Sequence, residues 1–451
     1  MEKIKKLRQL FKEEDIDGYL ICKNDEFFCG YLPKHNDRLQ FISNFSGSFG
    51  FALILKNKNY LFVDGRYTLQ ASNQSSKNFE IITISKNMPF EILKNKKYKI
   101  GFDPKLITKK TLSIFFNNCN CEFKPLNKNL VDKIWKRKII SKKTKFYSLP
   151  KNSVDHNYKF KMKKIVSNLK KKDADFQFIT SSENNAWLFN IRGNDEKYSP
   201  IPHCYVLINK NSDVYFFCDL KKINFSLKKN LKKVKFRKID SIAKFLSDIN
   251  NKSFIIDTNT CSFYFERKIS KNNKILNFRD PIYNLKSIKS KKEIENIKAA
   301  HIFDGAALTK YLFWVKKNYS RKKITEMSAS KKLFKFRKKN GNFIFPSFPT
   351  ISGTGPNAAI IHYKATKKSN LKLKKGNLYL VDSGGQYKFG TTDVTRTISL
   401  SNSNKRIKNI LEKAGITGKT FESIDQNLLV EKAEKKLFLF SSQLYEKIKI
   451  Q

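Results

Sequence analysis

The sequence predicts two consecutive α/β domains followed by a third domain of α+β type. A chain of 451 residues is too long for one ordinary hydrophobic core and suggests roughly two to four domains. Short apolar strands alternate with helices through the first part of the chain, whereas helical periodicity takes over after Ser290. The hydrophobic content of 40% and the charged content of 29% are typical of a globular protein.

The first segment opens with an amphipathic helix over Ile4–Lys12. Short apolar runs bounded by Lys, Asn and Gly follow, a pattern that indicates strands. These runs are Gly18–Cys22, Phe51–Leu55 and Tyr60–Val63. A lysine-rich stretch without clear periodicity, Lys136–Ser153, predicts a linker. We therefore expect the first domain to occupy residues 1–140.

The second segment, residues 155–285, repeats this pattern of a helix followed by short apolar strands. A basic helix is predicted over Tyr158–Lys172, and four apolar strands follow it. The strands are Phe176–Thr180, Cys204–Ile208, Val214–Cys218 and Phe254–Asp257. No residue-level repeat relates the two segments, but their common pattern favours a similar architecture.

The pattern changes at Ser290, where the third segment begins. Ser290 and Glu293 form a capping-box pattern, and apolar residues keep helical spacing as far as Val315. A second helix is predicted over Ile324–Lys338. After the glycine-bearing stretch that follows it, an apolar strand is expected through residues 359–361, and then a β-hairpin.

The net charge of +52 raises the question of nucleic acid or an anionic membrane surface as a partner. Only twelve of the 91 basic residues are arginine, and the lysines are spread over every region. A dedicated nucleic-acid surface would cluster its basic residues and favour arginine, whose forked guanidinium contacts phosphates and bases. The composition instead indicates drift in an A+T-rich genome, so nucleic acid is not the expected partner.

The seven cysteines are odd in number and follow no C-x-x-C spacing, which favours neither a disulfide framework nor a zinc ribbon. The start of the chain is amphipathic and lacks the continuous apolar segment of a signal peptide. The sequence contains no uncharged apolar run of about twenty residues, the length that spans a bilayer. We therefore expect a cytoplasmic protein without a membrane span.

The predicted hairpin carries the candidate chemistry. Leu378–Val381 is an apolar strand that ends at Asp382, and Asp393 begins another strand that runs to Leu400. Three glycines between the strands can reverse the chain: Gly384, Gly385 and Gly390. Two carboxylates held together repel unless they share a proton or a cation, and hard divalent ions suit such ligands. The spacing by itself also fits two surface aspartates near a turn.

The chain around this aspartate pair resembles the catalytic-domain signature of the Xaa-Pro aminopeptidases, in the pita-bread metallopeptidase superfamily. The resemblance is carried by VDSGGQYKFGTTDVTRTI and by the upstream stretch FPTISGTGPNAAIIHY. It extends in order along the chain to DRLQFISNFSGSFG and FVDGRYTLQA, to NAWLFNIRGND, and to SKKEIENIKAAHIFDGAALTKYLFWV. These three regions are similar to the family's first domain, its second domain and the helix that opens its catalytic domain.

The resemblance implies a fold and an activity. The fold is two creatinase-like α/β amino-terminal domains followed by a pita-bread catalytic domain over residues 286–451. The activity is release of the first residue from peptides whose second residue is proline. Most peptidases cannot bind the peptide bond before proline productively, because a prolyl amide lacks an N–H. Two divalent metal ions, with Mn²⁺ expected, are implied as cofactors, and the family often forms homodimers. Asp382 and Asp393 match metal ligands, and His362 matches a histidine that contacts the substrate.

The sequence also departs from the family. Members continue beyond the hairpin with an H-G-x-G-H stretch, an N-E-P-G turn and an R-x-E-N strand, which supply the other three of five metal ligands. Here the last histidine is His362 and the last proline is Pro356, so those motifs are absent and the catalytic histidine and glutamates cannot be assigned. We expect a truncated catalytic domain with a divergent tail from about residue 401 and impaired activity.

The sequence leaves the nature of the tail and two alternative functions open. The tail over residues 428–450 has an amphipathic helical pattern, although a frameshifted or rearranged ending explains it better. A non-catalytic family member that binds peptides or a partner subunit is the alternative to an enzyme. A nucleic-acid or anionic-surface binder is a third hypothesis and rests on charge alone.

Overall fold

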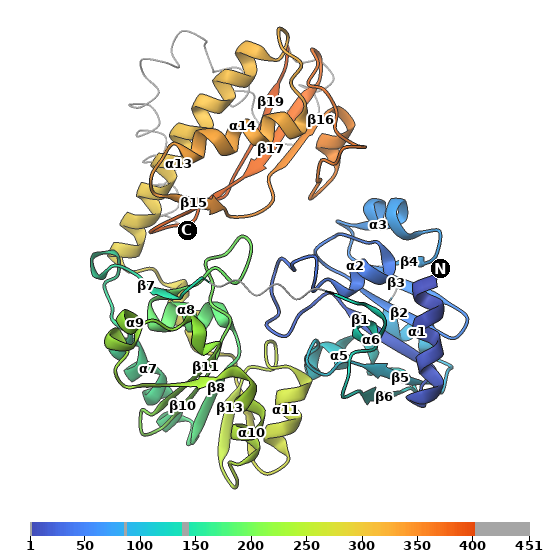
Figure 1. Ribbon diagram of the computed structural model, residues 1–451, viewed down its shortest axis with the longest axis vertical. Coiled ribbons are helices and arrows are strands. Elements are labelled where there is room, and N and C mark those ends of the chain that lie inside the picture. Colours follow the sequence, from blue (N-terminus) through green and yellow to red (C-terminus); the bar gives the residue numbers. More distant parts are fainter. Residues whose placement is uncertain (1, 85–87, 138–143, 402–451) are drawn as a thin grey trace. The chain divides into compact units, whose positions relative to one another are not determined.

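The computed structural model describes residues 2–84, 88–137 and 144–401 (Figure 1). The chain forms two compact units, Met1–Ile288 and Lys289–Gln451. The tail whose amphipathic pattern was noted above lies outside the described residues. Among the residues that are described, no helix is long and apolar enough to cross a membrane.

The amino-terminal half of the first unit is built on a six-stranded sheet with the order β4-β3-β2-β1-β5-β6. Its strands are β1 (Gly18–Cys22), β2 (Phe51–Leu55), β3 (Asn59–Val63), β4 (Glu80–Thr83), β5 (Lys99–Phe102) and β6 (Glu122–Pro125). Its helices are α1 (Glu2–Glu13), α2 (Arg38–Ser43), α3 (Thr68–Ser75), α4 (Pro89–Leu93), α5 (Lys109–Phe116) and α6 (Leu130–Ile134). Alternate strand residues such as Tyr19 and Leu20 enter two separate cores, so helices cover both faces.

The second half of this unit repeats the arrangement in the order β12-β11-β10-β8-β13-β14. Its strands are β8 (Phe176–Ile179), β10 (Tyr205–Asn209), β11 (Val214–Cys218), β12 (Val234–Lys238), β13 (Ser253–Ile256) and β14 (Lys274–Asn277), and a small pair is formed by β7 (Tyr147–Ser148) and β9 (Ile191–Arg192). Its helices are α7 (Tyr158–Lys171), α8 (Ser182–Phe189), α9 (Phe225–Asn230), α10 (Ile242–Ser247), α11 (Phe263–Ser270) and α12 (Ile282–Ser287). With β8 aligned on β1, every neighbouring pair has the same direction in both sheets. The expected similarity of the two architectures is therefore confirmed.

The loop after β5 meets the start of α11 within the first unit. The backbone N–H of Phe263 donates to the carbonyl oxygen of Ile107 at 2.8 Å, and that of Tyr264 donates to Pro104 at 2.8 Å. The ring of Phe263 also packs edge-on against Phe102, with ring centroids 5.2 Å apart. Apolar packing beside these hydrogen bonds excludes water, which would otherwise compete for the backbone groups.

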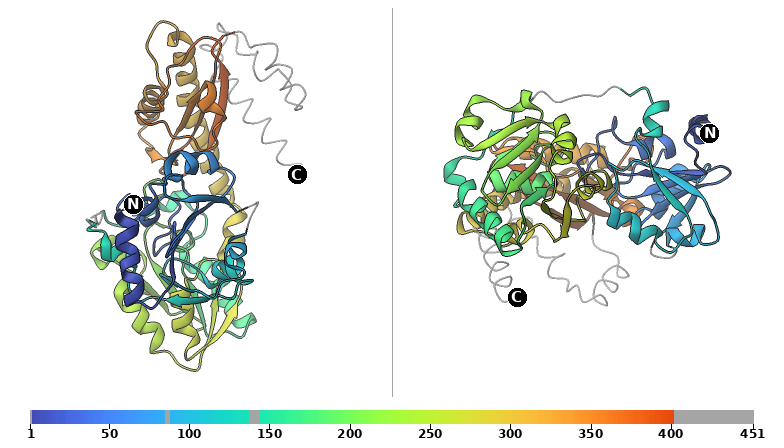
Figure 2. Two further views of the ribbon diagram at one scale, coloured as in Figure 1. Left: turned by 90° about the vertical axis from the view of Figure 1, so that its right-hand side faces the viewer. Right: turned by 90° about the horizontal axis from the view of Figure 1, so that it is seen from below.

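The second unit contains a three-stranded antiparallel sheet in the order β16 (Ile351–Thr354), β17 (Leu378–Ser383) and β19 (Val394–Ser399). The helices α13 (Lys291–Asn318) and α14 (Glu326–Lys338) lie on one side of these strands, gold beside orange in Figure 2 (left). Their apolar side chains share one core with the strands. Buried members of that core are Leu308, Tyr311, Val315, Leu333, Tyr379, Val381 and Ile398.

The predicted capping box at the start of α13 is confirmed. The Ser290 side chain accepts from the N–H of Glu293 at 3.3 Å, and the Glu293 carboxylate accepts from the N–H of Ser290 at 2.9 Å. We expect Ser290→Ala to lower the free energy of unfolding by about 1 kcal/mol, because it leaves a helix N–H without its partner. Chemical denaturation measures this loss of stability. Ser290→Thr keeps the hydroxyl and should lose little stability. Equal losses in both variants would contradict a capping role.

Two details of the third segment differ from the sequence prediction. The strand expected through residues 359–361 is wrong, because Gly355–Ala359 forms a 3₁₀ helix. Gly355 adopts φ +58° at the first position of this helix, and Pro356 follows with its ring-fixed φ, so the backbone leaves the extended conformation before the apolar residues begin. The hairpin is also not simple: between β17 and β19 the chain forms a short strand, β18 (Gly385–Tyr387), which pairs with β15 (Phe343–Pro346).

Candidate metal centre

The strand register places the two aspartates on one face of the sheet. Asp382 on β17 pairs with Thr395 on β19, and Asp393 lies two residues before Thr395. Because side chains alternate between faces, Asp393 and Thr395 share a face, and Asp382 faces the same way as the residue it opposes. Asp393 is the residue before β19, next to the end of β17 that carries Asp382, and the two carboxylates are close enough for Asp382 to raise the pKa of Asp393.

The connection between the aspartates closes tightly around Gly384. The Ser347 N–H donates to the Gly384 carbonyl at 3.1 Å, and the Ser347 hydroxyl donates to the carbonyl of Thr392 at 2.8 Å. Thr392 in turn exchanges hydrogen bonds with Gly385 through its backbone and its hydroxyl. These bonds fix the residue next to Asp393 against the residues that follow Asp382.

A buried ion pair supports the end of β17. Arg337 of α14 contacts Asp304 of α13 with both ends of its guanidinium fork, Nε to Oδ1 at 2.6 Å and Nη2 to Oδ2 at 2.8 Å. Arg337 also donates to the hydroxyl of Ser383 at 3.1 Å, and Tyr387 donates to Asp304 at 2.8 Å. The pair thus ties both helices to the residue that follows Asp382.

The electrostatics of the aspartates point to a cation. The Oδ1 atom of Asp382 is buried without a hydrogen-bond partner, whereas buried carboxylate oxygens are ordinarily satisfied. Desolvation by surrounding protein, and then the carboxylate of Asp382, raise the pKa of Asp393, while His301 opposes the rise. An orphaned oxygen beside a second carboxylate fits a hard divalent cation, which prefers oxygen ligands.

His301 is a neighbour of the site that the sequence reasoning did not single out. It lies on α13, where its Nδ1 is 2.9 Å from the carbonyl oxygen of Ile297, and its side chain is exposed. The β18–β19 connection packs on this part of the helix: a Cβ added at Gly390 would lie 2.9 Å from that of Ala300. In the sequence His301 fits only the helical spacing, and its distance along the chain from Asp393 gives no local signal.

His362, the predicted substrate contact, lies in the turn after the 3₁₀ helix, where it is exposed and has φ +54°. The segment that carries it is anchored by Glu326, which is fully buried at the start of α14. Glu326 accepts from the hydroxyl of Tyr363 at 2.8 Å and from the backbone N–H of Thr354 at 2.8 Å. Both exposed residues, His362 and Asp393, are therefore on supported backbone and accessible to a ligand.

Comparison with family models divides the chain into three matches. Two models described as Creatinase/Prolidase N-terminal domain match residues 3–134 and 137–293. A third, described as Metallopeptidase family M24, matches residues 295–418. The two six-stranded sheets of the first unit fall in the first two ranges, and the aspartate pair falls in the third.

Relatives and solved structures agree with these matches. The probable Xaa-Pro aminopeptidase P of Paracoccidioides lutzii is 36% identical over 421 residues, covering 87% of this chain and 68% of the relative. That of Laccaria bicolor is 33% identical over 423 residues, covering 88% and 64%. The crystal structure of X-prolyl aminopeptidase from Caenorhabditis elegans, described as a cytosolic enzyme with a di-nuclear active site, matches with a TM-score of 0.84 at 27% identity and covers 91% of this chain and 72% of that one. The chain therefore belongs to the aminopeptidase P family of the M24 metallopeptidases.

Proposed function

We propose that this protein is a metal-dependent aminopeptidase that releases the first residue from peptides whose second residue is proline. The observation that carries the proposal is the buried, unpartnered Oδ1 of Asp382 beside the carboxylate of Asp393, in a chain of this family. Proline-containing peptides are the proposed substrates because the relatives are Xaa-Pro aminopeptidases. Residues 286–451 are the proposed catalytic domain, preceded by domains at residues 1–140 and 155–285.

The proposed cofactors are two divalent ions, with Mn²⁺ as the preferred metal. Asp382 and Asp393 would hold them, since carboxylate oxygens suit such ions. Metal ions of this kind polarise a scissile carbonyl and supply a hydroxide nucleophile at neutral pH. A cytoplasmic location and a homodimer are further parts of the proposal, supported by the resemblance to the family.

The chain's own residues have separate roles in this proposal. Asp382 and Asp393 would hold the metal ions, and the Arg337–Asp304 pair fixes the strand end next to Asp382. His362 would contact the peptide from an exposed turn, and Glu326 holds that turn in place through Tyr363. Precise placement of this kind supplies a large part of the rate of many enzymes.

We expect Asp382→Asn to weaken Mn²⁺ binding by about 100-fold or more, because losing a direct ligand should cost at least as much as the 10–100-fold seen for outer-sphere partners. The measurement is Mn²⁺ titration of the purified chain, together with release of the first residue from an Xaa-Pro peptide. Glu295→Gln is the matched control, since it removes one exposed carboxylate from the same unit. Equal Mn²⁺ affinity in wild type and Asp382→Asn would sink the proposed metal site.

The same assay separates the remaining hypotheses. We propose that the 451-residue chain retains metal weakly and turns over slowly, because the described residues place only two carboxylates at the site and hard cations take about six ligands. Turnover at rates of about 1–10³ s⁻¹, typical of enzymes, would refute this impairment. Saturable binding of the peptide without cleavage would instead support the non-catalytic alternative, and absence of both binding and cleavage would overturn the proposed function.

A further inference from the structure

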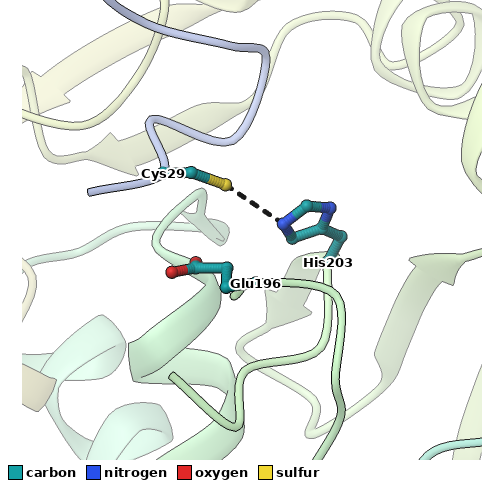
Figure 3. Close-up of side chains that lie close together, drawn as sticks. All are labelled: Cys29, Glu196 and His203. Atoms are coloured by element: carbon teal, nitrogen blue, oxygen red, sulfur yellow. Dashed lines mark hydrogen bonds between the residues drawn. The ribbon is translucent and has the colours of Figure 1, made fainter. Parts of the chain in front are cut away.

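A second cluster of metal-ligating side chains lies in the first unit (Figure 3). Cys29 is in the loop between β1 and α2, and Glu196 and His203 are in the loop between β9 and β10. One ligand atom of each, the Sγ, a carboxylate oxygen and a ring nitrogen, lies within 4.8 Å of the others. The thiol points at the imidazole, with Sγ 3.1 Å from Nε2, and Cys29 is only 6% exposed.

The loops that carry these side chains are held by other carboxylates. Asp25, which is 1% exposed, accepts from the N–H of Cys29 at 3.0 Å and from that of Phe27 at 3.1 Å. Asp195 accepts from the N–H of His203 at 2.8 Å and is paired with Lys222. Supporting contacts of this kind orient ligands in metal sites and reduce the ordering cost of binding.

The ring of His203 is also fixed in orientation. It stacks on Phe27 with ring centroids 4.1 Å apart and an interplanar angle of 15°. Phe27 stacks in turn on Tyr205, whose hydroxyl donates to the carbonyl oxygen of Glu26 at 2.5 Å. The imidazole of His203 and the thiol of Cys29 are therefore held facing each other from two loops of the first unit, with a carboxylate oxygen of Glu196 within 4.8 Å of both ligand atoms.

Several acidic side chains lie near the cluster. Burial, together with the carboxylates of Asp25 and Glu196, raises the pKa of the Cys29 thiol far above its usual range. Burial and Asp25 likewise raise the pKa of Glu196 to about 7.

We propose that Cys29, Glu196 and His203 form a binding site for a borderline-soft divalent cation, with Zn²⁺ the best match. Thiolate, imidazole and carboxylate are the three ligand types that zinc accepts, at bond lengths of about 2.0–2.3 Å. A tetrahedral ion with such bonds separates sulfur and nitrogen by about 3.5 Å, so Sγ and Nε2 would need to move apart by only a few tenths of an ångström. The fourth position is left for water, and binding releases the thiol proton to solvent.

This site differs in chemistry from the aspartate pair and does not depend on the proposed peptidase function. A thiolate ligand favours Zn²⁺ or Co²⁺ over Mn²⁺, whereas two carboxylates favour Mn²⁺. Because its ligands come from loops of both sheet-bearing halves, a bound ion joins those halves. Zn²⁺ should therefore raise the midpoint of thermal unfolding of the first unit, as any ligand that binds only the folded state does.

Titration of the reduced, metal-free 451-residue protein with Co²⁺ tests the proposal, because a thiolate–Co²⁺ bond gives charge-transfer absorption in the near ultraviolet and the aspartate pair has no sulfur. We expect this absorption in wild type at one equivalent, its loss in Cys29→Ser and its displacement by Zn²⁺. A Cys119→Ser, Cys121→Ser double variant, which removes two partly exposed thiols outside the cluster, should keep it. Asp382→Asn should keep it as well.

Two results would overturn the zinc site. One is the lack of thiolate–Co²⁺ absorption in wild type at saturating Co²⁺, a measurement that needs no variant and so does not depend on how the substitutions fold. The other is absorption of full strength in Cys29→Ser, which would assign the signal to a different cysteine. His203→Gln provides a second check, since it keeps the thiol and should weaken Co²⁺ binding by about 10-fold or more through loss of one ligand.

Discussion

Gly384→Ala is expected to lower the free energy of unfolding of the second unit by about 3 kcal/mol, the upper end of the usual cost of overpacking. A Cβ at this position would lie 2.8 Å from the carbonyl carbon of Thr392 and closer still to its oxygen and to the hydroxyl oxygen of Ser347. Backbone atoms cannot rotate away as a flexible side chain can, so the connection between β17 and β18 must open. The midpoint of thermal unfolding should fall by on the order of 10 °C, measured by calorimetry.

The same substitution should also weaken metal binding at the aspartate pair. Thr392 precedes Asp393, so a shift of its carbonyl moves that carboxylate away from Asp382. Gly341→Ala is the matched control: its added Cβ would meet no atom within 4 Å, and its effect should stay within about 0.5 kcal/mol. If Gly384→Ala were as stable as Gly341→Ala and bound Mn²⁺ like wild type, the close approach described at Gly384 would be incorrect.

Arg337→Met should destabilise the second unit by about 3–5 kcal/mol, because it leaves a buried carboxylate without its cationic partner. Arg337 is 1% exposed and Asp304 is 2% exposed, so water cannot replace the lost guanidinium. Equilibrium unfolding in urea measures the loss as a lower midpoint at unchanged slope. The hydroxyl of Ser383 loses its donor in the same variant, so Mn²⁺ binding at the neighbouring Asp382 should weaken too.

Two further variants separate charge from packing at this position. Lys338→Met removes an exposed positive charge from the next residue of α14 and should change the stability by no more than about 0.5 kcal/mol. The double variant Asp304→Leu, Arg337→Met should recover much of the stability, because apolar replacement of a whole buried pair is often tolerated. Recovery should be incomplete, since the hydroxyl of Tyr387 would lose its acceptor. A double variant no more stable than Arg337→Met would show that the unpaired charge is not the cause.

Several regular elements of this protein are encoded locally. Three strands form over the residues predicted for them: Gly18–Cys22, Phe51–Leu55 and Val214–Cys218. Runs of apolar β-branched and aromatic residues bounded by Lys, Asn and Gly strongly favour a strand over a helix or loop. The capping box at Ser290 needs only residues three positions apart, and it forms as predicted. Family membership could likewise be inferred from the sequence, since the stretches that carry the resemblance are contiguous.

The local sequence pattern did not predict the backbone correctly where glycine and proline opposed the strand preference of nearby apolar residues. The apolar residues Ala359, Ile360 and Ile361 favour a strand, but the positive φ of Gly355 and the ring of Pro356 direct the chain into a 3₁₀ helix. The short strand β18 could not be predicted from the sequence either, because its pairing partner, β15, lies on a distant stretch of the chain.

The sequence alone indicated the order of the domains, thirteen of their strands and helices, and the two aspartates proposed as metal ligands. Only the tertiary structure decided which distant residues meet. It placed His301 near Asp393, paired Arg337 with Asp304, and brought Cys29 to His203 across two loops. The physical reason is that strand periodicity and helix caps depend on neighbours in sequence, whereas a buried ion pair or a three-ligand cluster depends on how whole layers pack.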